Sequence, residues 1–222
     1  MPLKPSASAI LDRLLERYPV LLPCEREIRA AGEALMRSYQ NGGKLLICGN
    51  GGSCADGQHI VGELMKAFIL PRKIPSGDTQ ALERLDPAHG AYMAAHLQGA
   101  LPAISLAGEA ALTTAYINDV AADMVYAQQV WGYGRKDDVL LALSTSGRSR
   151  NVVLACTAAR AREMTVIALT GSQGRDVGER SDILIAVPAT ETYQVQELHL
   201  PVWHALCLML EETFFGEGSP EA

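Results

Sequence analysis

Five short apolar runs alternate with helix-type segments along this chain, and this alternation restricts the fold more than any other feature. The runs are KLLIC (44–48), LPAISLA (101–107), DVLLALS (138–144), TVIALTG (165–171) and DILIAVP (182–188). Short apolar runs separated by helices are typical of a parallel sheet that is covered on both faces. The sequence therefore predicts an α/β fold, a three-layer, doubly wound α/β/α sandwich with a five-stranded parallel sheet.

Apolar side chains at helical spacing predict the helices around this sheet. Helices over residues 7–18 and 24–40 come first, and Gly42-Gly43 would end the second one as a C-cap pair. We predict that residues 1–43 serve packing between subunits and that residues 44–215 form the sandwich domain of a single structural unit. Further helices are expected over residues 53–66, 91–99, 109–119, 120–134, 148–163 and 195–215, with a short helix or turn at 175–181.

The segment from about residue 67 to 102 interrupts the alternation of strands and helices. Pro71, Pro75, Gly77, Pro87 and Gly90 punctuate it, and its pattern is irregular. We interpret this segment as an insertion into the domain. A lid, a subunit interface and a specificity loop are all compatible with it.

The charge balance and the cysteines limit the partners and the compartment. A net charge of −6 argues against a broad nucleic-acid surface, which needs clustered Lys and Arg. The five cysteines form no CxxC pair, so we expect the reduced thiols of a cytoplasmic protein. No apolar run approaches the roughly 18 residues of a membrane span, so no membrane partner is expected.

The loop GNGGS follows the first predicted strand and opens a helix. Its glycines, Gly51 and Gly52, let the backbone approach an anion, and the start of the helix adds a partial positive charge. Asn50 and Ser53 add polar side chains. An ordinary strand-to-helix turn with Ser53 as N-cap is the alternative interpretation.

A second loop, LSTSGRSRN at 143–151, also follows a buried strand and opens a helix. Four hydroxyl side chains surround its glycine, those of Ser144, Thr145, Ser146 and Ser149. Capping needs one hydroxyl, whereas a phosphate cradle uses several together with helix N–H groups. Two such loops at strand ends predict one small phosphorylated ligand between them. With no GxGxxG and no Gly-Lys-Ser/Thr ending, a nucleotide is not expected.

Two predicted helices carry candidate catalytic or metal-binding side chains. His59 and Glu63 are four residues apart, so they project from one helix face as a proton-transfer pair, two metal ligands or a simple helix-stabilising pair. In the last helix, Gln196 and His204 share a broad face. Pro201 lies between them, removes a backbone donor and should bend that helix.

Together these motifs resemble the sugar isomerase (SIS) family and, within it, the phosphoheptose isomerases. The matching features occur in order over most of residues 24–213. They are CGNGGS with a following H-x-x-x-E, the pair Asn118-Asp119, STSG with Ser149, and the ending Q-E-x-H-x-x-x-x-H. The resemblance implies the flavodoxin-like SIS fold, a homotetramer as the oligomer, and active sites that draw on neighbouring subunits.

The resemblance also implies roles for individual residues. The implied acid/base pair is Glu63 and His204. One zinc ion per subunit would be bound by His59, Glu63, Gln196 and His204. The implied substrate-binding residues are Asn50, Gly51, Gly52, Ser53, Glu63, Asn118, Asp119, Ser144, Thr145, Ser146, Ser149 and Gln196.

The implied reaction converts sedoheptulose 7-phosphate into D-glycero-D-manno-heptose 7-phosphate by acid/base proton transfer through an enediol. A carboxylate and an imidazole suit the transfers between C1 and C2 and between O1 and O2. A residue that ligates zinc is less free to act as a base, so the division of labour stays open. The alternatives are a non-catalytic SIS scaffold or regulator, such as a replication-initiator partner, and an isomerase of another sugar phosphate.

Overall fold

The computed structural model of the chain describes residues 3–217, so residues 1 and 2 of the predicted N-terminal segment lie outside it. Five parallel strands form one sheet in the order β2-β1-β3-β4-β5. The strands are β1 (Leu45–Cys48), β2 (Ala103–Ser105), β3 (Val139–Ser144), β4 (Thr165–Thr170) and β5 (Ile183–Ala186). Each lies within one of the five predicted runs, and the predicted fold class is confirmed.

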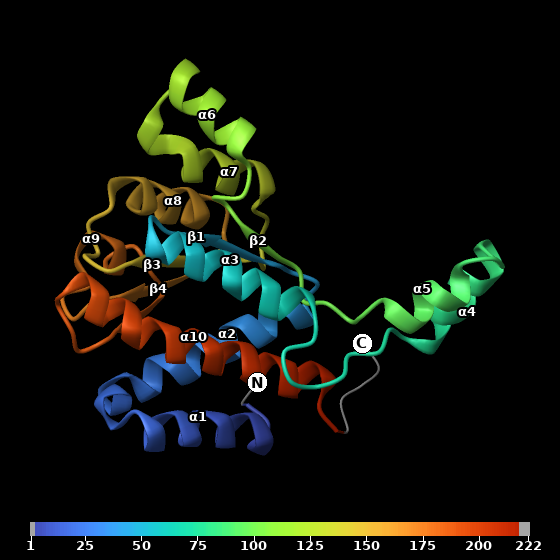
Figure 1. Ribbon diagram of the computed structural model, residues 1–222. Coiled ribbons are helices and arrows are strands. Elements are labelled where there is room, and N and C mark those ends of the chain that lie inside the picture. Colours follow the sequence, from blue (N-terminus) through green and yellow to red (C-terminus); the bar gives the residue numbers. More distant parts are fainter. Residues whose placement is uncertain (1–2, 218–222) are drawn as a thin grey trace.

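Helices cover both faces of this sheet (Figure 1). One face packs against α2 (Glu25–Gln40), α3 (Gly52–Met65) and α10 (Thr192–Phe215), and α1 (Pro5–Arg17) packs on the outside of α10 and α2. The other packs against α7 (Val125–Tyr133), α8 (Arg150–Ala161) and α9 (Arg175–Gly178), with α6 (Ala110–Asp119) beyond α7. Two 3₁₀ helices, η1 (Pro19–Cys24) and η2 (Ala122–Met124), connect neighbouring elements.

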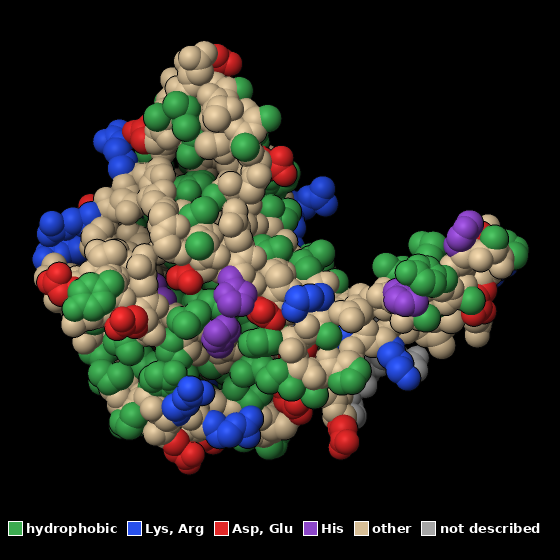
Figure 2. Space-filling model, in the orientation of Figure 1, with side chains coloured by type: hydrophobic (Ala, Val, Ile, Leu, Met, Phe, Trp, Pro, Cys, Tyr) green, Lys and Arg blue, Asp and Glu red, His purple; other side chains and the backbone are tan. Residues whose placement is uncertain are grey.

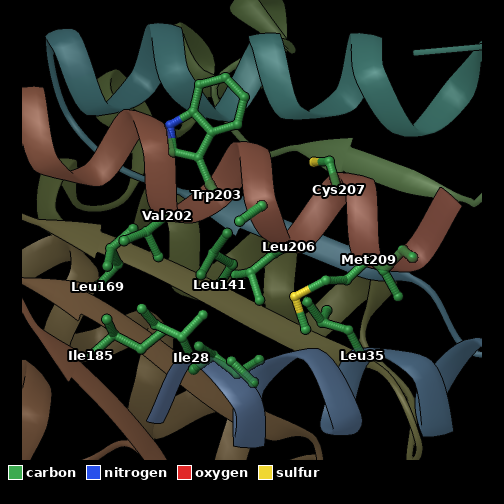
Figure 3. Close-up of a cluster of buried hydrophobic side chains, with 14 of the residues drawn as sticks. Ile28, Leu35, Leu141, Leu169, Ile185, Val202, Trp203, Leu206, Cys207 and Met209 are labelled. Carbon is green, nitrogen blue, oxygen red and sulfur yellow. The ribbon is translucent and has the colours of Figure 1, made fainter. Parts of the chain in front are cut away.

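Alternate residues of each strand supply the two cores. In β3, Leu141 faces α10 and α2 while Leu140 faces α7 and α8, because successive strand side chains point to opposite faces. Figure 3 shows Leu141 and Leu169 of the sheet meeting Leu206 of α10 and Ile28 of α2. Both faces are therefore dry, and polar ligands are confined to the ends of the strands.

Two helix predictions need correction. The predicted helix over 120–134 starts late, because Ala121 is extended (φ −160°, ψ 123°) and η2 intervenes before α7. The insertion contains a second helix that was not predicted, α4 (Ser76–Leu85), next to α5 (Gly90–His96). Pro75 and Gly77 indicate a loop in sequence, yet Pro75 serves as the N-cap of α4.

The helices α4 and α5 form an arm that projects away from the body (Figure 1). They pack on each other, and Leu85 and Tyr92 leave 79% and 67% of their surface exposed. The base of the arm is closed by an antiparallel bridge between Lys73 and Gln98.

The last helix, α10, continues through Pro201 over its whole length. Among the described helices, none combines the length and apolarity that crossing a membrane requires.

His199 of α10 is fully buried, and its protonation is linked to the stability of the fold. Burial lowers the pKa of His199 from 6.5 to about 4, and the backbone of Thr170 only partly offsets this effect. The folded chain therefore holds a neutral imidazole at pH values where the unfolded chain binds a proton.

We expect the free energy of unfolding to fall as the pH drops from about 6.5 towards 4, by up to about 3 kcal/mol from His199. The reason is that unfolding takes up a proton in this window. Urea unfolding of the wild type and His199→Gln at several pH values measures the effect. His204, whose pKa is also lowered, contributes in the same direction in both proteins. An identical pH dependence in the variant would refute the assignment to His199.

Candidate functional site

The loop after β1 holds its glycines in conformations that side chains would obstruct. Gly51 has a positive φ of 56°, which favours glycine, and it precedes the first turn of α3. A Cβ on Gly52 would lie 2.5 Å from Nε2 of Gln196. Ser53 lies within the first turn, and α3 has no side-chain cap. Ser53 is therefore not the N-cap of α3, because that position is occupied by Gly51.

The loop after β3 presents its hydroxyl side chains around Gly147. Gly147 has a φ of 66° and lies close against the backbone of Gly174. Ser149 is the N-cap of α8 without a side-chain cap bond, and the Ser144 hydroxyl donates to the Ser149 hydroxyl at 3.2 Å. The hydroxyls of Ser144 and Ser149 therefore lie beside each other at the start of α8.

A brace that the sequence interpretation missed holds the first loop in place. The Tyr126 hydroxyl lies 2.6 Å from the carbonyl oxygen of Gly49 and 3.3 Å from Oδ1 of Asn50. The side-chain amides of Asn50 and Asn151 lie within 2.9 Å of each other. Asn151 belongs to the second loop motif, whereas no local pattern marks Tyr126. The brace ties both loops and α7 into one unit.

A cavity of about 260 Å³ lies between the two loops. Its lining contains the predicted Asn50, Gly51, Gly52, Ser53, Ser144, Thr145, Ser149 and Gln196, together with Leu143 and Thr192. Thr192, the first residue of α10, was not predicted, although a hydroxyl there resembles those of the second loop. Ser146 instead lines a neighbouring cavity of about 150 Å³ with Thr145 and Arg148. The loops and α10 thus converge on a polar site of sugar-phosphate size.

A second group of side chains lies further along α3 and α10. Nε2 of His59 is 3.1 Å from Oε1 of Glu63, and the ring of His204 lies 5.5 Å from the ring of His59. Trp203 contacts both imidazoles, at 4.8 and 4.0 Å between ring centroids. Figure 2 shows histidine side chains gathered at the centre of this face. The structure therefore brings His59, Glu63 and His204 together.

The surroundings of this group favour an uncharged His204 and an available carboxylate. Burial lowers the pKa of His204, as does nearby His59, and Glu63 opposes the shift. Oε2 of Glu63 is buried and accepts no hydrogen bond from the described residues, while Nζ of Lys66 lies 3.7 Å away. A neutral imidazole and a carboxylate oxygen are thus both present to accept a proton or bind a cation.

A half-buried carboxyl adjoins the group and was also missed in the sequence. Burial raises the pKa of Asp56, while His59 and the indole of Trp203 lower it in part. Asp56 precedes His59 by three residues, so the two share one face of α3. This spacing was the available signal, because Asp, His and Glu recur along the same helix face.

Other predicted residues lie apart from this group. Gln196 is eight residues from His204, about 12 Å along the helix, and its side chain contacts Gly52. Asn118 and Asp119 end the exposed helix α6, hydrogen-bonded to each other at 2.8 Å, and do not line the cavity. Within residues 3–217, no three His, Cys, Asp or Glu side chains are arranged as ligands of one ion. The zinc ligand set and the binding of substrate by Asn118 and Asp119 stay predictions.

Comparisons with known proteins agree on one family. The chain matches the SIS domain family over residues 87–171. The phosphoheptose isomerase of Roseiflexus sp. (strain RS-1) is 36% identical over 190 residues, which cover 86% of this chain and 83% of that protein. The solved phosphoheptose isomerase from Francisella tularensis has a TM-score of 0.70 at 30% identity, covering 91% of this chain and 98% of that one. The one from Neisseria gonorrhoeae has a TM-score of 0.65 at 31% identity, covering 90% and 98%.

These matches reach well beyond the two loops. The SIS domain match includes the second loop and ends before α10, but the full-length relatives extend over most of both chains. The two solved structures share the fold at 31% and 30% identity. The resemblance seen in the motifs is thereby confirmed, and the chain belongs to the phosphoheptose isomerase family of SIS-domain proteins.

Proposed function

We propose that this chain interconverts sedoheptulose 7-phosphate and D-glycero-D-manno-heptose 7-phosphate as a ketose–aldose isomerase. The observation that carries the proposal is the layout of α3 and α10. One end of the pair meets the polar cavity between the loops, and the other end brings Glu63 and His204 together. The relatives named phosphoheptose isomerase support the same activity.

The cavity would bind the phosphate end of the sugar. Hydroxyls of Ser144, Thr145 and Ser149 line it, and the N-termini of α3 and α8 lie beside it. Helix N-termini and hydroxyl donors both stabilise a phosphate dianion. A phosphate bound there would direct the carbon chain along α3 and α10 towards Glu63.

Glu63 and His204 would then move the protons at the reacting carbons. One group takes the C1 proton of the ketose and returns it at C2, and the other moves a proton between O1 and O2. A neutral imidazole suits either transfer, because it both accepts and donates near neutral pH. The non-catalytic scaffold gains no support from the relatives, and an isomerase of another sugar phosphate would use the same groups.

We expect Glu63→Gln and His204→Asn each to lower kcat by about 10²- to 10⁴-fold, because each removes one proton-transfer group. Purified protein is incubated with sedoheptulose 7-phosphate, and aldose formation is followed. Glu27→Gln, a change of the same kind at the start of α2 and outside the site, should leave turnover unchanged. Wild-type protein without turnover, or variants as active as wild type, would overturn the proposal.

We also propose that one zinc ion per subunit assists the reaction. The donors of His59, Glu63 and His204 are of the types that zinc prefers, and the three side chains lie near one another, although they are not arranged around one ion. The buried Oε2 of Glu63 has no hydrogen-bond partner among the described residues. Gln196 lies about 12 Å along α10 from His204, so its side chain would have to turn from Gly52 towards His204 to supply its amide oxygen. When bound, zinc would act as a Lewis acid on the substrate oxygens.

Chelation should lower both activity and the melting temperature, and added Zn²⁺ should restore them, because bound metal stabilises the folded chain. Elemental analysis should give about one zinc per chain in the wild type and much less in His59→Ala. His89→Ala, on the arm, is the control. Fully active protein that contains no zinc would contradict this second proposal.

We propose further that the chain works as a homo-oligomer, with a tetramer as the expected form, in the cytoplasm. A groove of about 910 Å³ runs between α1 and α10 and includes Phe68, Leu200 and His204 in its lining. A second subunit over this groove would exclude water from His204. The reduced cysteines are compatible with a cytoplasmic protein, since all five are free.

Leu200→Lys should weaken assembly and lower kcat together, because it places a charge in the groove beside His204. Light scattering after size-exclusion chromatography reports the mass of the assembly. Leu112→Lys on α6 is the matched control, since Leu112 and Leu200 are both 39% exposed. A monomeric wild type with full activity would refute the oligomer.

A further inference from the structure

A buried ion pair links the helix of Glu63 to the helix of His204. Nε of Arg72 lies 2.8 Å from Oε1 of Glu211, and the two side chains are 0% and 1% exposed. Arg72 follows α3 by seven residues, and Glu211 follows His204 by seven residues on α10. The pair therefore lies at the far end of the two helices that carry the proposed catalytic groups.

Arg72 closes the end of α3. Its Nη1 donates to the carbonyl oxygen of Leu64 at 2.7 Å, and its Nη2 donates to that of Glu63 at 2.8 Å. The last carbonyls of a helix have no partner within the helix, and a planar guanidinium can satisfy two of them at once. Arg72 therefore holds the backbone of the very residue whose carboxylate is proposed to transfer protons.

Glu211 holds the segment that follows α3. Its carboxylate accepts hydrogen bonds from the backbone N–H groups of Phe68, Ile69 and Leu70 at 2.8 to 3.1 Å. Burial raises the pKa of Glu211, but these bonds and Arg72 outweigh burial, and the pKa lies below its usual value. The ring of Phe68 in turn lies 5.6 Å from the ring of His204.

A purely structural role does not account well for such an arrangement. Buried ion pairs contribute little net stability compared with apolar side chains of similar size, because both charges lose their hydration. The hydrogen bonds of this ion pair fix three backbone segments relative to one another. These segments are the end of α3, residues 68–70 and the last turns of α10.

We propose that Arg72 and Glu211 are positioning residues that set the separation of the Glu63 and His204 side chains. The inference rests on the proposed isomerase activity, and neither residue lines the cavity that would bind the phosphate. Their effect should therefore fall on the chemical step and not on substrate binding.

Arg72→Lys is the discriminating variant. Lysine keeps the charge next to Glu211 but cannot donate to both carbonyl oxygens of α3 while it pairs with the carboxylate. We expect kcat to fall about 10- to 100-fold with KM nearly unchanged, because small misplacements of catalytic groups are costly. The pH dependence of kcat should shift as well. Glu211→Asp, which keeps the charge but shortens the reach, should have the same effects.

Arg162→Lys is the matched control. Arg162 also donates through two nitrogens to one helix end, the carbonyl oxygen of Gly134, but α7 and α8 lie on the opposite face of the sheet from α3. This variant should keep wild-type kcat. Both lysine variants are assayed well below their melting temperatures, so that a difference in folded fraction does not enter.

Amide hydrogen exchange gives a readout that is independent of turnover. Exchange over residues 62–70 should accelerate in Arg72→Lys and stay unchanged in Arg162→Lys. A wild type without isomerase activity would defeat the proposed function, while exchange would still report whether Arg72 holds the end of α3. The positioning proposal is overturned if Arg72→Lys keeps wild-type kcat, or if its exchange over these residues matches that of the wild type.

Discussion

The reversal of strand order between β1 and β3 is the constraint on which the site depends. The chain leaves β1 for the sheet edge at β2 and returns to pair β3 with β1 on its other side. Connections leave these two adjacent strands in opposite directions, which opens a crevice at their carboxyl ends. The loops of Asn50 and Ser144 must then face each other. Both faces of the sheet are sealed by apolar side chains, so this crevice is where the sheet can accept a polar ligand.

The packing of α3 against α10 extends that crevice into a reaction site. Each helix begins at the cavity, with Gly52 and Thr192, and each later carries a candidate proton carrier, Glu63 or His204. Two rigid helices can hold such groups more accurately than loops can. The Arg72–Glu211 pair closes the far end of the same arrangement. The proposed phosphate site and the proposed proton carriers are therefore separated along one axis, so substitutions at either end should affect different kinetic constants.

The local sequence pattern was enough to predict the sheet and the two loops. It was not enough for residues whose role depends on partners that are distant in the sequence. The apolar runs mark all five strands, because a strand that is buried on both faces consists mostly of apolar residues. The loop residues cluster as expected, since parallel strands end at one edge. Tyr126 and Glu211 show the limit. Nothing in the neighbouring sequence indicates the role of a tyrosine or a glutamate on a mostly apolar helix. Tyr126 contacts Gly49, which is 77 residues away, and Glu211 contacts Arg72, which is 139 residues away.

The segment over residues 67–102 projects a separate surface from the body without entering the site. Its two ends are held together, since Gly99 donates to the carbonyl oxygen of Arg72 at 2.9 Å and Gln98 accepts from the Ala67 amide. With the ends fixed, a longer connection adds little loop-closure entropy. The arm can therefore vary while Arg72 stays in register with Glu63. Its short helices leave Leu85 and Tyr92 exposed, and isolated helices of this length are marginal in water. The base of the arm and Arg72 share the connection that follows α3, so the backbone contacts that fix the arm also fix the residue that closes the end of α3.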